Sequence, residues 1–182
     1  MDDFLAMVDE LEVDIRGTPA AAARKIQVMG TFERRGQLKS VEDVDRYVRA
    51  GRATITLVSR RTKTRFTYKV SKPEKDDGPV KFFVGLMNGP DNQNNYVYMG
   101  CIKQTYNGEY FTGTKASKVS RDAPSYKAFE WFWQKIITNK RSPDEWGVDV
   151  WHEGSCCRCG RKLTVPESVE DGIGPECRKR MV

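Results

Sequence analysis

The hydrophobic pattern of the chain changes to a period of two near Ala53, and this change constrains the fold more than any other feature. In the stretch ATITLVSRRTKTRFTYKV, Ile55 and Leu57 alternate with threonines, and Phe66 and Tyr68 alternate with polar residues. Such alternation is typical of a β-strand with one buried face. Because the intervening SRRTKTR is polar, the two runs predict a β-hairpin with a basic tip.

Further strands are expected downstream of this hairpin. The runs VKFFVGLM and NYVYMGCI are rich in β-branched and aromatic residues, and the NGPDNQN between them carries the turn steps Asn-Gly and Gly-Pro. The segment GEYFTGTKASKV predicts a short edge strand. We therefore expect an antiparallel sheet of four to five strands.

Helices are expected on both sides of this sheet along the chain. Residues 3–14 and about 19–35 read as helices, and Ser40 can cap a shorter helix over 41–50. After the strands, APSYKAFEWFWQKIITN places aromatic and aliphatic side chains on one helical stripe. We expect this aromatic-rich helix, residues 123–139, to pack across one face of the sheet, which gives an α+β fold with N-terminal helices.

Most of the cysteines and the only histidine lie near the C-terminus, in the spacing His152-x3-Cys156-x2-Cys159-x17-Cys177. Two residues between Cys156 and Cys159 allow a tight turn that aims both thiolates at one point, and Gly160 lets this turn close. The pattern predicts a small finger that holds one structural zinc ion through His152, Cys156, Cys159 and Cys177. His152 is included because no further cysteine lies nearby. The metal would supply most of the folding energy of so small a module.

Other roles for these cysteines fit the sequence less well. A redox-active Cys-x-x-Cys pair is typical of a thioredoxin-like βαβ unit, which this region lacks. With Cys157 as a ligand in place of Cys156, only one residue would separate it from Cys159, too few for a knuckle. The acidic N-terminus MDDFLAMVDELEVD lacks the features of a secretory signal, so we expect a reducing, cytoplasmic location where disulfides are rare. Cys101 is expected in the core.

The C-terminal sequence WHEGSCCRCGRKLTVPESVEDGIGPECRKR resembles a small zinc-finger family found at the C-termini of uncharacterised bacteriophage and bacterial proteins. The shared pattern is close to H-x3-C-x2-C-G-R-x-L-T, then P-E-S, then G-x-G-P-x-C. The resemblance covers about 30 of the 182 residues. It implies zinc and a phage or mobile-element origin, and it implies no activity. Residues 1–150 resemble no family.

The net charge of +6 is concentrated in the middle of the chain: residues 51–121 carry thirteen basic and five acidic side chains, whereas residues 1–50 have a net charge of −2. Two clusters of cations lie in this middle part, one at the hairpin tip and one before the aromatic-rich helix. They are Arg60, Arg61, Lys63 and Arg65 in the first, and Lys115, Lys118 and Arg121 in the second. If both lie on one side of the sheet, they form a phosphate-binding surface for DNA or RNA, and the basic side chains of the finger would add a second surface. Any of Tyr68, Tyr96 and Tyr98 that faces solvent would stack on bases.

Catalysis is not expected. The only histidine is assigned to zinc, the sequence has no Gly-rich phosphate loop or HExxH pattern, and a closed zinc site leaves no position for a substrate. We therefore expect a binding protein with no small-molecule substrate and no membrane partner. The alternative to a nucleic-acid partner is a host protein, such as an enzyme or a defence complex that a phage-encoded factor inhibits or redirects. Trp131 or Phe132, if exposed, would anchor such an interface.

These expectations divide the chain into three segments. A helical region covers residues 1–50, an α+β core with the basic hairpin covers residues 51–140, and the zinc finger covers residues 148–182. The segment RSPDEWGVD, with its proline and glycine, is expected to be a linker between the core and the finger.

Overall fold

The computed structural model of the chain describes residues 36–74, 78–91 and 94–180. The helices predicted over residues 3–14 and 19–35 lie outside the described residues. The chain from Gly36 onward belongs to one compact unit. Within the described ranges, no helix combines the length and the apolar character needed to cross a membrane.

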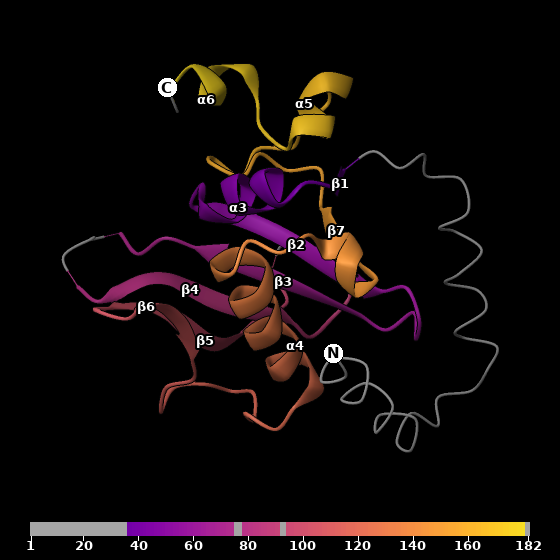
Figure 1. Ribbon diagram of the computed structural model, residues 1–182. Helices are drawn as coiled ribbons and strands as arrows, with labels where there is room; N and C mark the ends of the chain where they lie inside the picture. The colour runs from indigo at the N-terminus through magenta and orange to yellow at the C-terminus, as the bar shows by residue number, and fades with distance from the viewer. Residues whose placement is uncertain (1–35, 75–77, 92–93, 181–182) are drawn as a thin grey trace. The chain divides into compact units, whose positions relative to one another are not determined.

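A seven-stranded antiparallel sheet, in the order β1-β7-β2-β3-β4-β5-β6, forms the centre of this unit (Figure 1). The strands are β1 (Gln37–Leu38), β2 (Arg52–Ser59), β3 (Arg65–Ser71), β4 (Val80–Met87), β5 (Tyr96–Thr105), β6 (Gly108–Thr112) and β7 (Val148–His152). The predicted hairpin is β2–β3, and the three further predicted strands are β4, β5 and β6. The α+β class is therefore confirmed, and the sheet has two more strands than the pattern predicts.

β7 is the more consequential of these two additional strands. It pairs with β2, from Ile55 opposite His152 to Ser59 opposite Val148, and with β1 on its other side. The segment expected to be a linker instead forms a 3-10 turn, η4 (Pro143–Trp146), that leads directly into β7. The predicted boundary at residue 148 therefore coincides with the first residue of an internal strand of the sheet.

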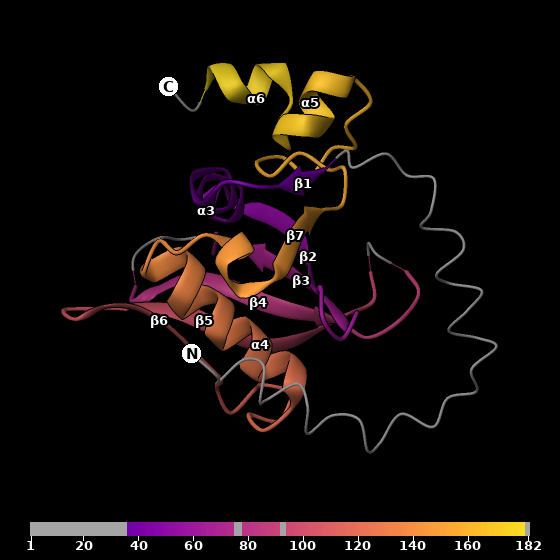
Figure 2. The same ribbon diagram turned by 45° about the vertical axis from the view of Figure 1, so that its right-hand side comes forward.

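Two helical segments cover one face of the sheet (Figures 1 and 2). Helix α3 (Val41–Arg49) follows Ser40, whose hydroxyl accepts a hydrogen bond from the backbone N–H of Asp43 at 3.1 Å, as expected for its cap. Helix α4 (Pro124–Phe132) continues into a π-helical turn, η3 (Trp133–Thr138). α4 and η3 together are the predicted aromatic-rich helix, and they pack across the sheet as expected.

Aromatic rings fill the core between the helices and the sheet. The ring of Phe129 lies 4.9 Å from that of Tyr68 and 4.9 Å from that of Phe111, between centroids. Trp133 of η3 lies 5.9 Å from Phe82 of β4 in the same way. Tyr68 is fully buried in this layer. It is therefore a core residue and cannot stack on a base.

The chain after β7 forms a finger that ends in two short helices, α5 (Pro166–Asp171) and α6 (Pro175–Lys179). In both views these helices lie on the same side of the unit as α3 (Figures 1 and 2). A small antiparallel bridge between Ser155 and Lys162 forms the base of the finger. The finger therefore consists of a hairpin-like turn followed by two helices.

Direct contacts join the finger to α3 and β2. A Cβ atom on Gly172 would lie 2.5 Å from the ring of Tyr47, so this glycine allows the finger to approach the helix closely. The hydroxyl of Tyr47 donates to the carbonyl of Ser155 at 3.1 Å. The backbone N–H of Arg52 donates to the carbonyl of Cys157 at 2.7 Å. The finger and the sheet therefore share a packed and hydrogen-bonded contact.

Candidate metal centre and candidate nucleic-acid surface

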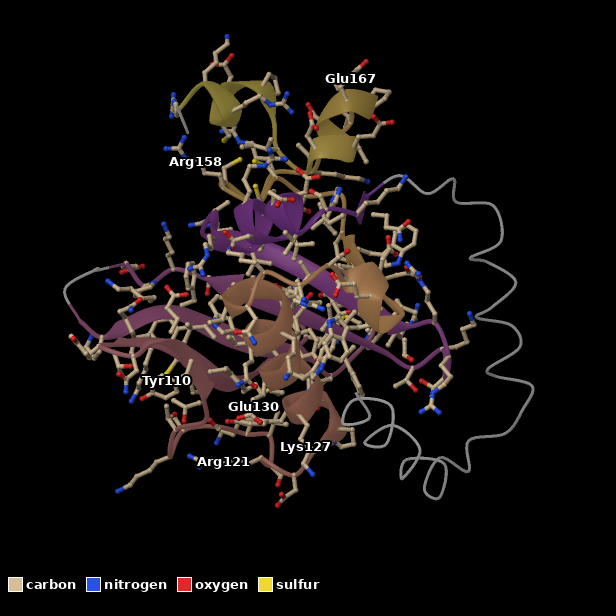
Figure 3. The ribbon with its side chains drawn as sticks, in the orientation of Figure 1. Tyr110, Arg121, Lys127, Glu130, Arg158 and Glu167 are labelled. Atoms are coloured by element: carbon tan, nitrogen blue, oxygen red, sulfur yellow. The ribbon has the colours of Figure 1, made fainter. Side chains whose placement is uncertain are left out.

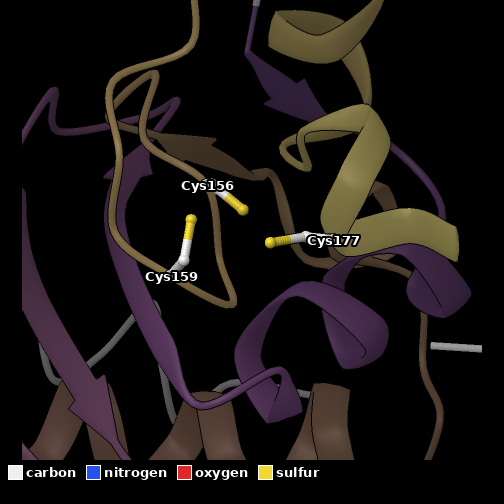
Figure 4. Close-up of side chains that lie close together, drawn as sticks. All are labelled: Cys156, Cys159 and Cys177. Carbon is white, nitrogen blue, oxygen red and sulfur yellow. The ribbon is translucent and has the colours of Figure 1, made fainter. Parts of the chain in front are cut away.

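Cys156, Cys159 and Cys177 place their sulfur atoms within 4.8 Å of one another (Figure 4). The first two stand on a tight turn, in which the N–H of Gly160 donates to the carbonyl of Cys156 at 2.8 Å. Gly160 has a φ of +77°, a backbone conformation that favours glycine. Cys177 comes from α6. The fold therefore brings together three of the four predicted metal ligands.

The electrostatics of this cluster favour a cation. Burial raises the pKa of Cys156, but hydrogen bonds from the backbone of Gly174, Cys159 and Arg158 lower it by more, to about 7. Burial, followed by the neighbouring thiols, raises the pKa of Cys177 to about 11. Three thiolates so close together repel one another, so they ionise together only around a positive charge. Cysteine thiolates are soft ligands for metals such as zinc, and the cluster can therefore hold a metal ion.

The structure does not bring His152 into this cluster. Its side chain is 6% exposed, and its ring centroid lies 5.2 Å from that of Tyr47. The Nδ1 atom accepts a hydrogen bond from the N–H of Gly154 at 3.1 Å. Burial lowers the pKa of His152, an effect that the nearby backbone of Val169 opposes, so the imidazole is neutral at pH 7. Its Nε2 atom is buried with no hydrogen-bond partner among the described residues. In this arrangement His152, the last residue of β7, packs against α3 and the finger.

Cys157 and Cys101 lie outside the cluster and are buried. The N–H of Cys157 donates to the carbonyl of Gly172 at 3.0 Å, so its backbone ties the knuckle to the end of α5. Burial, followed by the charge of Cys156, raises the pKa of the Cys157 thiol to about 12. Cys101 is buried in β5, as the sequence predicts for a core cysteine.

The cations of the hairpin tip interact with their neighbours. Arg60 donates from Nε to the carboxylate of Asp149 at 2.8 Å, and its Nη2 pairs with Asp144. Arg61, Lys63 and Arg65 are exposed, and both arginines have partners of their own. Arg60 therefore holds the tip against η4 and β7.

The second predicted cluster lies in the loop between β6 and α4. Lys115 and Lys118 are exposed, and Arg121 donates to the carbonyl of Gly113 at 3.2 Å (Figure 3). The strand pairing places this loop and the hairpin tip at the same end of the sheet, with β4 and β5 between them. The two clusters therefore share one end of the sheet without forming one continuous strip.

The strand face of β3 to β6 that lies opposite α4 combines aromatic and basic side chains. We call it the open face. Strand register identifies its residues, because side chains directly opposite one another share a face. Phe83 is opposite Cys101, Gly85 is opposite Tyr98, and Lys103 is opposite Tyr110. By the same register Cys101 is also on this face, where it is buried. The open face is defined by the aromatic and basic residues Lys69, Phe83, Tyr96, Tyr98, Lys103 and Tyr110.

The aromatic rings of the open face are partly accessible. Phe83 is 41% exposed and Tyr110 is 44% exposed. The ring of Phe83 meets that of Tyr98 edge to face, with centroids 6.2 Å apart. The ammonium group of Lys69 lies 5.5 Å from the centroid of Tyr96, a cation–π contact. Two exposed rings, on the strands that flank β5, thus stand beside a second pair of half-buried rings.

The open face carries no acidic side chain among the described residues of β3 to β6. The only acid in these four strands is Glu109, which alternates with Tyr110 and faces the helices. There it pairs with Arg49 of α3 at 2.8 Å. Lys69 and Lys103 therefore meet no carboxylate from these four strands. Toward β2, the carboxylate of Glu153 accepts a hydrogen bond from Thr56 at 2.6 Å, and burial followed by the charge of Glu153 raises the pKa of Tyr96 to about 12.

The aromatic residues suggested as protein-interface anchors are not accessible. Trp131 and Phe132 are both buried. Trp131 packs edge to face against Trp146, with ring centroids 5.5 Å apart. The α4 helix therefore uses its aromatic residues for the core, and the exposed rings lie on the opposite side of the sheet.

Comparison with known proteins identifies a similarity in the finger alone. Residues 151–182 match the model of a family described as "Family of unknown function (DUF6011)". No curated protein and no solved structure matches the chain. The C-terminal segment, which includes the three clustered cysteines, is therefore similar to a family whose description assigns no function.

Proposed function

We propose that this protein is a non-catalytic, zinc-stabilised protein that binds single-stranded DNA or RNA across the open face. The observation that carries the proposal is the pair of partly exposed rings, Phe83 and Tyr110, on a face where strands β3 to β6 contribute lysines and no acid. Aromatic rings stack on bases of any sequence, and lysines neutralise the phosphates between them.

The arrangement favours a single strand over a duplex. In a duplex the flat faces of the bases are stacked on one another, so a protein ring has no base face to contact. A single strand can turn its bases toward a sheet, and four-stranded sheets with exposed aromatic rings are a common surface for this recognition. Phe83 and Tyr110 lie on strands separated by β5 alone, so successive bases can reach both rings.

The predicted basic clusters would extend this surface at one end. Lys115 and Lys118 are exposed in the loop after β6, and the hairpin tip lies at the same end of the sheet. A strand that crosses the open face and continues past this end would meet them. These lysines and arginines would contact the phosphate backbone, so their contribution to affinity would not depend on the base sequence.

Zinc is the metal that we assign to the cysteine cluster. Three thiolates that converge from a knuckle turn and a helix suit its tetrahedral geometry, and N–H groups next to the sulfurs stabilise their charge. Its role is to hold the finger in the form that packs on Tyr47 and Arg52, and the nucleic acid binds elsewhere.

The affinity for a labelled oligonucleotide of about 12 nucleotides tests the proposal. Fluorescence anisotropy at about 50 and about 200 mM salt would be compared for wild type, Phe83→Ala and Tyr110→Ala. Each substitution should weaken binding roughly 5- to 150-fold, the equivalent of about 1–3 kcal/mol for one stacked base. A variant with Lys69→Ala and Lys103→Ala should instead reduce the dependence on salt.

A control on the other face of the sheet is Lys127→Ala, which removes one lysine from α4 (Figure 3). It should leave both affinity and salt dependence unchanged. Folded Phe83→Ala and Tyr110→Ala proteins that bind as tightly as wild type would refute the proposal. So would a preference for the duplex over the single strand.

A further inference from the structure

The three-cysteine cluster lacks a fourth ligand among the other cysteines and the histidine of the chain. The sequence has five cysteines and one histidine, which leaves Cys101, Cys157 and His152. All three lie in the described part, and none joins the cluster. Zinc sites built from thiolates take four ligands, so the fourth must have another source.

Each of these three residues is held in place by other contacts. His152 is packed on Tyr47, and its Nδ1 accepts a hydrogen bond from Gly154. Cys157 is fixed by backbone hydrogen bonds to Gly172 and Arg52. Cys101 belongs to β5, which is separated from β7 by β2, β3 and β4 in the sheet. Recruiting any of them would break the contact between finger and sheet or the sheet itself.

Carboxylates near the cluster do not complete it either. Among the described residues, no aspartate or glutamate oxygen lies within the 4.8 Å that groups the three sulfurs. The closest candidate by position is Glu176, next to Cys177, and its carboxylate pairs with Lys179 at 3.1 Å. Asp171, at the end of α5, pairs with Arg178.

A cavity of about 210 Å³ opens directly beside the three cysteines. This is far more than the roughly 10–15 Å³ that one water molecule needs. Its wall includes all three cysteines together with Arg161, Lys162, Leu163, Thr164, Val165 and Glu176. A small molecule or a side chain of another protein can therefore reach the metal position from this side.

The charges around the cavity favour a negative donor. A divalent metal with three thiolates carries a net charge of −1, and the wall residues Arg161, Lys162 and Glu176 together carry a net charge of +1 that balances it. The carboxylate of Glu176 is also paired with Lys179. Thiolate is a donor that is both negative and soft enough to match the other three ligands. We propose that the fourth coordination position of this metal centre is open to the cavity and accepts a thiolate from outside the chain. The thiol releases its proton to solvent as its sulfur coordinates.

Cobalt(II) in place of zinc makes this testable, because its absorption reports the number of thiolate ligands. The full chain loaded with cobalt would be titrated with 2-mercaptoethanol. The sulfur-to-cobalt absorption should rise saturably by about one third, as three thiolates become four. In a variant with Arg161→Ala and Lys162→Ala, the starting spectrum should be unchanged and the thiol should bind about 2- to 10-fold more weakly.

Three further variants decide whether His152, Cys157 or Glu176 fills the position. His152→Ala, Cys157→Ser and Glu176→Gln should each leave the cobalt spectrum unchanged before thiol is added, whereas Cys156→Ser should lose absorption. A change of spectrum in any of the first three would overturn the proposal. So would a spectrum that does not respond to thiol, or one that vanishes because thiol removes the metal. Parallel titrations with glutathione and with a cysteine-containing peptide distinguish a small free thiol from a protein as the donor. None of these readouts involves nucleic acid, so they stand or fail separately from the proposed function.

Discussion

At the scale of single residues, the contact of Gly172 with Tyr47 determines how closely the finger approaches α3. Gly172 has a φ of +68°, and a Cβ atom there would lie 2.5 Å from the tyrosine ring. Gly154 offers a comparison within the same finger, because its φ is +65° and nothing lies within 4 Å of an added Cβ. Substitutions at these two glycines therefore separate the free-energy cost of the left-handed backbone from the cost of crowding against Tyr47.

Gly172→Ala should therefore lower the free energy of unfolding by about 2–4 kcal/mol, since it combines backbone strain with overpacking against Tyr47. Gly154→Ala should cost only the backbone part, about 1 kcal/mol. Urea denaturation of the metal-loaded proteins measures both values. Equal costs for the two variants would mean that the finger does not pack on Tyr47 as described.

At the same scale, the four predicted metal ligands differ in how well the sequence alone predicts their positions. Cys156 and Cys159 are predictable because two intervening residues fix a local turn, whatever the rest of the chain does. The position of His152 is not local, because pairing of β7 with β2 and the ring of Tyr47 determine where its imidazole lies. A spacing pattern carries no information on such long-range contacts.

At the scale of elements, the length of a periodic run decides whether the sequence predicts it. The strands β2 to β6 and the α4 helix have hydrophobic patterns long enough to be recognised in the sequence. β7 has five residues, directly after a turn with proline and glycine, and β1 has two. Phe82 and Phe83 are adjacent, so a strand must place one of them on each face. The adjacent phenylalanines therefore indicate that the sheet has a second face with an aromatic residue. Which of the two faces α4 covers is determined only by tertiary packing.

The position of β7 predicts that the core does not fold without it. Truncation after Glu145 removes β7 and leaves β2 with an unpaired edge, so this fragment should lose its cooperative thermal transition. Truncation after Gly154 keeps β7 and should retain a transition at a lower temperature. Circular dichroism melts of the two fragments and the full chain measure this. If the shorter fragment melted like the full chain, the core would be the independent module that the sequence suggests.

At the scale of the whole molecule, the proposed function gives the two faces of one sheet different tasks. One face carries α3, α4 and the buried ring cluster around Phe129, and it supplies the core. The other presents Phe83 and Tyr110 beside lysines, and we assign it to the nucleic acid. The finger closes the β7 side of the unit through Tyr47 and Arg52. This division explains why the exposed rings and the metal centre are separate sites.

NMR mapping of the aromatic ring signals tests this division most directly, because it compares rings on the two faces of the same sheet. The labelled protein would be titrated with a single-stranded oligonucleotide of about 12 nucleotides. The ring signals of Phe83 and Tyr110 should shift progressively, while those of Phe129 and Trp133 in the core remain in place. Shifts confined to the finger or to the helical side, or no shifts at all, would contradict the assignment of the open face as the binding surface.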